Sequence, residues 1–267
     1  MKNRLLNVFI PRLFSRLPPG HPLIFQFCRN YVDAFNNENN SDIHTNGEYT
    51  LMRKYLPESK MVFDVGANIG LWSKLALEIN HSIILHSFEP SHPTYITLLN
   101  NLKSRENVIC NNFGLSSSRQ RAELLVFEKE SGMNSLYPRE GLEDGWGIHP
   151  QSIKEDIELR TLDDYCAEKE IRQIDFLKVD IEGNELELFR GAKNLLSNNQ
   201  IRLVQFEYGG TYIDSRTFLK DIFKFFNNYP TYRFYKIFPS SLKLFEHYDQ
   251  REENFQYQNW VVTNALL

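Results

Sequence analysis

The segment Met61-Val62-Phe63-Asp64-Val65-Gly66-Ala67-Asn68-Ile69-Gly70-Leu71-Trp72 decides the fold of this chain. Its apolar start predicts a buried strand that ends at Asp64, and apolar residues at helical spacing follow Gly70. A strand, a glycine turn and a helix in this order direct the start of the helix toward a ligand. Gly66 can adopt a positive φ where a ligand approaches, and Gly70 can let the helix pack closely. Alone, the turn also fits an ordinary strand-to-helix connection.

A second apolar segment, 83–88, predicts a second strand, and it ends in Glu89-Pro90. An acidic residue at this tip, about twenty residues after the glycine turn, is placed to accept both hydroxyls of a ribose. The alternative is a solvated loop charge, but Pro90 stops the strand and fixes the carboxylate at the edge of the sheet. Asn68 replaces a glycine that would lie against a pyrophosphate in a dinucleotide site. The pattern therefore favours a nucleoside without phosphates.

Three motifs together resemble the FkbM family of S-adenosylmethionine-dependent methyltransferases: Phe63–Gly70, Phe88–Pro90 and Leu177–Glu185. The resemblance covers 47–267. It implies S-adenosylmethionine as cofactor and O-methylation of a sugar or glycoconjugate hydroxyl, in polysaccharide or natural-product biosynthesis. The pair Gly47-Glu48 before the first strand also resembles the family, and Glu48 is a secondary site candidate.

Strands and helices alternate along the rest of the chain, which predicts a mostly parallel sheet covered on both faces. The expected fold is α/β: a doubly wound, seven-stranded Rossmann-like methyltransferase sheet with an antiparallel edge hairpin. The hairpin comes from the two closing strands, which have no helix between them. We expect an N-terminal helical and loop extension over 1–46 and the methyltransferase domain over 47–267. Further strands are predicted at 107–113, 121–127, 174–179, 201–206, 232–237 and 256–263, and helices at 92–102, 161–168, 184–196 and 214–226. The segment 157–160 is predicted to be short and extended, and 239–250 is predicted to be rich in turns.

Composition limits the class of partner and the compartment. The chain has 267 residues and a net charge of −4, so no basic bias points to nucleic acid as a partner. Its three cysteines form no C-x-x-C motif, which argues against a disulfide framework or a zinc site and fits a cytoplasmic protein. No spacing of carboxylates demands a metal ion, and none is assigned.

Residues 1–32 stand apart because they contain five basic residues and no Asp or Glu. Apolar residues alternate with these charges, which fits peripheral contact with an anionic membrane surface. The other interpretation is one or two helices that pack on the catalytic domain with the basic residues in water. Four prolines interrupt a long amphipathic face and favour the second interpretation. The oligomeric state stays open.

Polar residues end several predicted strands, and ligands in such sheets bind beyond the carboxyl ends of the strands. Lys178 and Asp180 point to one face because side chains alternate along a strand. Asp180 and Glu207 are the candidate bases for a hydroxyl acceptor, and Lys178 is placed to orient Asp180 or bind the acceptor oxygen. Phe113 is placed to lie against an adenine. The predicted cofactor-binding residues are Asp64, Gly66, Asn68, Gly70, Glu89, Asn112, Phe113 and Asp180.

The long loop 131–151 is predicted to form part of the acceptor pocket or its lid, because long loops in compact domains are usually functional. Its Asn134, Ser135, Tyr137, Arg139, Trp146 and His149 suit a polyhydroxylated ligand. Three other functions remain open at this point. They are N-methylation of a small molecule or peptide, a non-catalytic nucleoside-binding subunit, and a nucleotide-dependent dehydrogenase, which the missing third glycine disfavours.

Overall fold

The computed structural model describes residues 11–12, 20, 22–103, 105–127, 132–139 and 152–265. Its centre is an eight-stranded sheet in the order β10-β9-β11-β8-β7-β1-β2-β3. Neighbouring strands from β3 to β8 are parallel, and β11 runs antiparallel to both β8 and β9. The strands are β1 (Met61–Val65), β2 (Ile84–Phe88), β3 (Val108–Asn111), β7 (Phe176–Val179), β8 (Leu203–Tyr208), β9 (Arg233–Phe238), β10 (Ser241–Phe245) and β11 (Gln258–Thr263).

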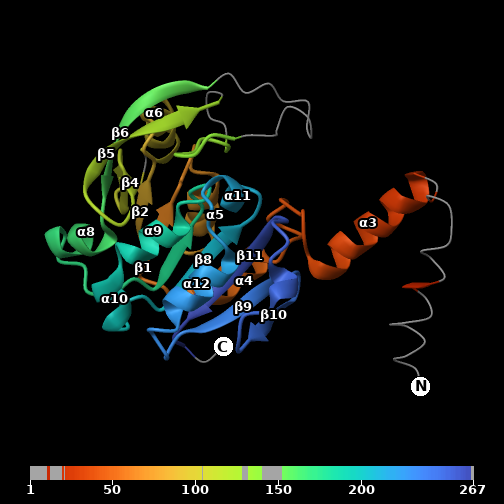
Figure 1. Ribbon diagram of the computed structural model, residues 1–267. Coiled ribbons are helices and arrows are strands. Elements are labelled where there is room, and N and C mark those ends of the chain that lie inside the picture. The colour runs from red at the N-terminus through yellow and green to blue at the C-terminus, as the bar shows by residue number, and fades with distance from the viewer. Residues whose placement is uncertain are drawn as a thin grey trace.

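A smaller sheet of three strands stands beside the carboxyl ends of β1 to β3 (Figure 1). Its strands are β4 (Gly114–Leu115), β5 (Gln120–Val126) and β6 (Ile153–Arg160), in the order β4-β6-β5. The segment 157–160, predicted to be short and extended, is the end of the longer β6. This sheet supplies one wall of the site described below.

Side-chain alternation along β1 divides the core between the two faces of the large sheet. Val62 belongs to the cluster that also contains Trp72 and Phe176, whose ring centroids are 5.6 Å apart. Phe63 belongs to the opposite cluster, 6.0 Å from the ring of Tyr165. The covering helices are α4 (Glu48–Tyr55), α5 (Leu71–Ile79), α6 (His92–Leu102), α8 (Leu162–Glu168), α9 (Glu185–Arg190), α10 (Lys193–Ser197), α11 (Thr211–Asp214) and α12 (Leu219–Phe226).

The predicted fold class is confirmed, with two differences in detail. The sheet has eight strands where seven were predicted, because β10 forms inside the segment 239–250 that was expected to be a turn. The edge hairpin is consequently β9–β10, while β11 inserts between β8 and β9. The helix predicted over 184–196 is two helices, and the break falls at Gly191, where a Cβ would lie 2.1 Å from the carbonyl oxygen of Ser116. The predicted helix 214–226 begins only at Leu219.

The helix α3 (Pro22–Asn36) projects away from the body (Figure 1) and has no buried residue. The chain returns to the body at Asn37, whose side-chain amide donates to the carbonyl oxygens of Asn46 and Ile237. Glu38 then forms a buried ion pair of 3.1 Å with Lys236 of β9. Across the described residues, no helix combines the length and the apolar character that crossing a bilayer requires.

Candidate functional site

The turn after β1 is held against the tips of β2 and β7. The backbone N–H groups of Gly66 and Ala67 both donate to the carbonyl oxygen of Phe88, at 3.1 and 2.9 Å. Gly66 has a φ of 78°, and a Cβ there would lie 1.8 Å from the carbonyl oxygen of Asp180. No side chain fits this gap, so glycine at this position lets the glycine turn and the β7 tip meet.

Glu89 is clamped by this turn, in agreement with its predicted position. One carboxylate oxygen accepts from the Asn68 N–H at 3.0 Å, and the other from the Ser91 N–H at 2.9 Å. Glu89 is only 6% exposed, and burial raises its pKa to about 7 against the two backbone hydrogen bonds. Each oxygen keeps a further lone pair, so the carboxylate can still accept two hydroxyl protons.

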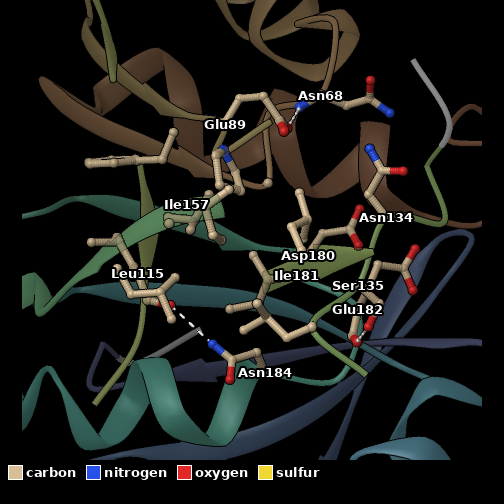
Figure 2. Close-up of a pocket in the computed structure, with 18 of the residues that line it drawn as sticks. Asn68, Glu89, Leu115, Asn134, Ser135, Ile157, Asp180, Ile181, Glu182 and Asn184 are labelled. Atoms are coloured by element: carbon tan, nitrogen blue, oxygen red, sulfur yellow. Dashed lines mark hydrogen bonds between the residues drawn. The ribbon is translucent and has the colours of Figure 1, made fainter. Parts of the chain in front are cut away.

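A cavity of about 710 Å³ opens beside Glu89, and we call it the Glu89 cavity. Figure 2 shows Leu115 and Ile157, from the small sheet, across this space from Asp180 and Asn134. One side is therefore apolar and the other polar, which suits an adenosine with a flat base and a hydroxylated sugar. The side-chain oxygen of Asn68, in the wall, is buried and lacks a hydrogen-bond partner among the described residues.

The turn after β7 carries the motif Asp180-Ile181-Glu182-Gly183-Asn184. The Glu185 carboxylate is 1% exposed and accepts from the N–H groups of Ile181 and Gly183, at 3.0 and 3.4 Å. Glu182 has a φ of 56°, and its carboxylate pairs with Arg139 at 2.5 Å. The hydrogen bonds to Glu185 therefore fix the backbone of the turn, and the ion pair with Arg139 joins the turn to the segment 132–139.

A second cavity of about 970 Å³ lies on the other side of Asp180, and we call it the Glu207 cavity. Gly66, Asn68 and Asp180 line both cavities, so the two spaces meet at the tips of β1 and β7. The second cavity is lined by carboxylates and amides from α4, β8 and β11: Glu48, Gln205, Glu207 and Asn259, with Tyr257 and Trp72. Trp72 is 6% exposed, and its indole nitrogen has no hydrogen-bond partner among the described residues.

The positive charge of Lys178 lies among the carboxylates of Asp180, Asp64 and Glu48. Its ammonium lies 3.1 Å from Asp180 and 3.6 Å from Asp64, with 10% of the side chain exposed. Burial opposes its charge, but the carboxylates of Asp180, Asp64 and Glu48 outweigh burial and raise its pKa. Burial, reinforced by neighbouring carboxylates, raises the pKa of Glu207 well above its ordinary value. Lys178 therefore holds Asp180 in place by a charge-assisted hydrogen bond.

Three further residues of this cluster were not predicted as site residues: Gln205, Tyr257 and Asn259. Glu48, the secondary candidate, accepts from the side-chain amides of Gln205 at 2.5 Å and Asn259 at 3.1 Å. The Tyr257 hydroxyl lies 3.5 Å from the same carboxylate. The available signal was strand alternation: Gln205 and Glu207 share a face of β8, and Asn259 pairs with Glu207 across the ladder. Polar residues inside otherwise apolar strands marked this face.

Four of the predicted cofactor-binding residues do not line either cavity: Asp64, Gly70, Asn112 and Phe113. Asp64 is fully buried and accepts from the Ser73 hydroxyl at 2.7 Å, beneath the site. Gly70 starts α5 with a φ of 84°, and a Cβ there would lie 2.8 Å from Leu98, so it serves helix packing.

Asn112 and Phe113 instead support the tip of β2 and the core behind it. The Asn112 amide donates to the carbonyl oxygens of Glu89 and Pro90 at 3.0 Å. The ring of Phe113 packs 5.6 Å from Phe88, with the Arg160 guanidinium 4.4 Å from its centroid. Leu115, two residues further along, faces the cavity in the place expected for Phe113.

Of the predicted loop 131–151, the structure describes 132–139. Asn134 and Ser135 line the Glu89 cavity, and the Ser135 hydroxyl donates to the carbonyl oxygen of Glu182 at 2.9 Å. Trp146 and His149 lie outside the described residues. Within the described chain, no group of three or more His, Cys, Asp or Glu residues is arranged to hold a metal ion.

Comparison with known proteins defines the class. The Methyltransferase FkbM domain matches residues 64–234, which is more than half of the chain. The chain therefore belongs to the FkbM methyltransferase domain family. This membership confirms the predicted family, and the cofactor expected for the family is S-adenosylmethionine. The clamped carboxylate of Glu89, the gap left by Gly66 and the unpartnered oxygen of Asn68 fit that cofactor.

Two curated relatives are similar to this chain. The methyltransferase sdnD of Sordaria araneosa is 31% identical over 160 residues, 51% of this chain and 62% of the relative. The hexuronic acid methyltransferase AglP of Haloferax volcanii is 28% identical over 169 residues, 61% of this chain and 64% of the relative. The chain thus spans less than two thirds of either relative. Among solved structures, M. capricolum TrmK with S-adenosyl-homocysteine gives a TM-score of 0.43 at 13% identity, covering 82% of this chain and 68% of TrmK, so the fold assignment depends on the strand order itself.

Proposed function

We propose that this protein transfers the methyl group of S-adenosylmethionine to a hydroxyl group of a sugar or glycoconjugate. The observation that carries this proposal is the position of Asp180, which lines both cavities where they meet. The nucleoside of the cofactor occupies the Glu89 cavity, and the acceptor enters from the Glu207 cavity. A wall of carboxylates and amides suits a polyhydroxylated acceptor, because each hydroxyl finds a hydrogen-bond partner there. The name of the AglP relative, a hexuronic acid methyltransferase, supports the same acceptor class.

The residues of the chain have separate roles in this reaction. Bound S-adenosylmethionine supplies a methyl group on a cationic sulfur. Glu89 accepts the ribose hydroxyls, and the Gly66 turn fixes the cofactor against the tip of β7. Asp180 accepts the proton of the attacking hydroxyl while Lys178 keeps its carboxylate in one orientation. Glu207 and Glu48 bind other hydroxyls of the acceptor. Positioning supplies much of the rate, because the reacting atoms must be held about 3 Å apart.

The direct test is an assay of the purified protein with S-adenosylmethionine and a panel of acceptors. The panel contains hexuronic acids, neutral oligosaccharides, and amines of similar size. We expect mass spectrometry to show a single added methyl group on a sugar, and NMR to place that methyl carbon on oxygen. Calorimetry on the same sample measures cofactor binding. Cofactor binding with methyl transfer only to amines would contradict the O-methyltransferase proposal.

The role of Asp180 is tested by a pair of variants. Asp180→Asn keeps the size of the side chain and removes the base, so we expect turnover to fall roughly 10²–10⁴-fold with cofactor affinity nearly unchanged. Glu207 lines only the Glu207 cavity, to which we assign the acceptor. For Glu207→Gln we therefore expect mainly a raised KM for the acceptor. A folded Asp180→Asn enzyme with unchanged turnover would remove Asp180 from the chemistry.

A further inference from the structure

The helix α3 carries the largest group of exposed apolar side chains in the described part of the chain. Its 15 residues include none that is buried. The exposed fractions reach 67% for Phe25, 72% for Phe27 and 72% for Phe35, and Ile24, Tyr31 and Val32 are at least half exposed. Water-exposed aromatic side chains in such number mark a surface that another apolar body covers.

The faces of α3 are sharply divided. Ile24, Phe27, Tyr31 and Phe35 are three and four positions apart and lie on one side of the helix. Leu23, Phe25 and Val32 extend this side, so that the apolar arc covers roughly 200° of the circumference. The remaining arc carries Gln26, Arg29, Asn30 and Asp33, of which Gln26 and Asn30 are hydrogen-bonded at 2.7 Å. This arc is wider than the narrow seam of a helix pair, and it fits a helix that lies half-immersed in a flat apolar medium.

The charge of the chain is distributed unevenly, and this identifies the medium. Residues 1–32 carry five basic residues, Lys2, Arg4, Arg12, Arg16 and Arg29, without any Asp or Glu. Removing these five charges from the net −4 of the chain leaves −9 on residues 33–267. Residues 1–36, which contain all of α3 and therefore also Asp33, have a net charge of +4, and residues 37–267 have −8. An anionic surface therefore attracts the segment that holds α3 and repels the catalytic body.

The length of α3 excludes a spanning role for this helix. Fifteen residues rise about 22 Å, less than the roughly 30 Å of a bilayer core. We infer that α3 binds the surface of an anionic phospholipid membrane, with its Phe-rich face in the acyl boundary and its polar face, which carries Arg29, toward the headgroups. This inference does not depend on the methyl acceptor.

The way α3 joins the body supports the same arrangement. Directly after the helix, Asn37 donates to Ile237 at 2.9 Å and Glu38 pairs with Lys236 at 3.1 Å. Three and five residues after Glu38, Ser41 and Ile43 line the Glu207 cavity. The membrane-binding helix is therefore anchored next to the cavity that we assign to the acceptor.

The test is co-sedimentation of the full chain with vesicles. We expect binding to phosphatidylcholine vesicles that contain phosphatidylglycerol, at least ten-fold weaker binding to pure phosphatidylcholine, and loss of binding as salt is raised. Phe27→Glu/Phe35→Glu should reduce binding at least ten-fold while the melting temperature and cofactor affinity stay unchanged. The matched control is Ile153→Glu, since Ile153 of β6 is 74% exposed and lies off the helix; it should bind as the wild type.

Three results would overturn the inference. If the wild-type protein sediments with vesicles no better than the double variant, α3 does not bind membranes. Equal binding to neutral and anionic vesicles removes the charge selectivity. A dimer in light scattering that the double variant abolishes, without vesicle binding, assigns the same face to contact between two copies of the chain.

Discussion

Gly66 sets the distance between the turn after β1 and the tip of β7, which carries Asp180. A Cβ on this residue would lie 1.8 Å from the carbonyl oxygen of Asp180, well inside contact distance. Any side chain must therefore push the cofactor turn away from the candidate base. Since methyl transfer depends on holding the reacting atoms together, we expect even a small displacement here to reduce the rate.

At Glu89 the prediction concerns cofactor affinity. Glu89→Ala removes the acceptor of both ribose hydroxyls and also frees the N–H groups of Asn68 and Ser91. We expect binding of S-adenosylmethionine to weaken by roughly 1–3 kcal/mol, measured by calorimetry. Glu58→Ala, an exposed glutamate outside both cavities, serves as the control. Equal affinity in the Glu89→Ala and control proteins would exclude the ribose role.

Single residues also show what the sequence could predict about the site. Glu89, Asp180, Lys178 and Glu207 line a cavity as expected, because each lies at or near a strand tip. Asp64 belongs to the same pattern, but it is the fourth residue of β1 and points into the core. Pattern alone does not say whether a polar residue near a tip faces the ligand or supports a neighbour from below. That choice depends on the packing of Ser73, on the next helix.

At the scale of elements, the segment 132–139 and the turn after β7 form one unit. Ser135 donates to the backbone of Glu182, Tyr137 to Asn184 at 3.2 Å, and Arg139 pairs with Glu182. The segment borders the Glu89 cavity, so it covers the cofactor side of the site. The acceptor role of the loop stays a prediction, and under the proposed function this segment also borders the space assigned to the nucleoside.

The ion pair between these two elements gives the next prediction. The side chains of Arg139 and Glu182 are only 9% and 17% exposed, so Arg139→Met leaves a carboxylate without its partner. We expect a loss of roughly 3–5 kcal/mol in the free energy of unfolding, measured by urea denaturation. Arg139→Met/Glu182→Gln should recover much of this loss because the uncompensated charge is gone. A double variant no more stable than Arg139→Met would show that the pair is not coupled.

The elements that sequence reasoning missed have a common physical cause. β10 consists of Ser241-Leu242-Lys243-Leu244-Phe245, a weakly apolar segment that becomes a strand only through its pairing with β9. The break between α9 and α10 falls at Gly191, where the backbone of the distant Ser116 approaches so closely that a Cβ would lie 2.1 Å from its carbonyl oxygen. Local pattern predicts elements that bury a continuous apolar face. It does not predict elements that long-range contacts create.

For the whole molecule, the contacts of residues 37–46 predict where the folded unit begins. The sequence predicted a domain from residue 47, yet Asn37 and Glu38 are buried against β9. A chain that begins at residue 37 should melt at the same temperature as the full chain. One that begins at residue 47 lacks Glu38, but Lys236 keeps its ion pair with Glu252 at 2.7 Å, so we expect a loss of roughly 1–3 kcal/mol in urea denaturation. Equal stability of both truncated chains would show that 37–46 is an appendage.

The pH dependence of stability follows from buried carboxyl groups. Burial raises the pKa of both Glu89 and Glu185 to about 7, from an ordinary 4.5. Burial also lowers the pKa of His86 to about 4, an opposing effect that ends near pH 6.5. Between pH 6.5 and 8 the folded state binds more protons than the unfolded chain, so stability falls as pH rises.

Thermal melts of the ligand-free protein across this window measure the effect. For Glu89 alone the full shift corresponds to roughly 3 kcal/mol. Glu185→Gln removes one of these two carboxyl groups and should flatten the slope between pH 6.5 and 7.5. A melting temperature that rises from pH 6.5 to 8 would contradict the assignment of these carboxyls as buried and protonated.

The fluorescence of one tryptophan, Trp72, should report ligand binding in the Glu207 cavity. Trp260 is fully buried, and its indole nitrogen donates to Gln258 at 3.1 Å, away from solvent. Trp72 instead stands in the wall of the Glu207 cavity with its indole nitrogen unpartnered in the described chain. An acceptor that enters this cavity changes the polarity around Trp72 and leaves Trp260 untouched. In a Trp146→Phe background, the shift in emission wavelength therefore titrates acceptor binding without a label, and Trp72→Phe abolishes the signal.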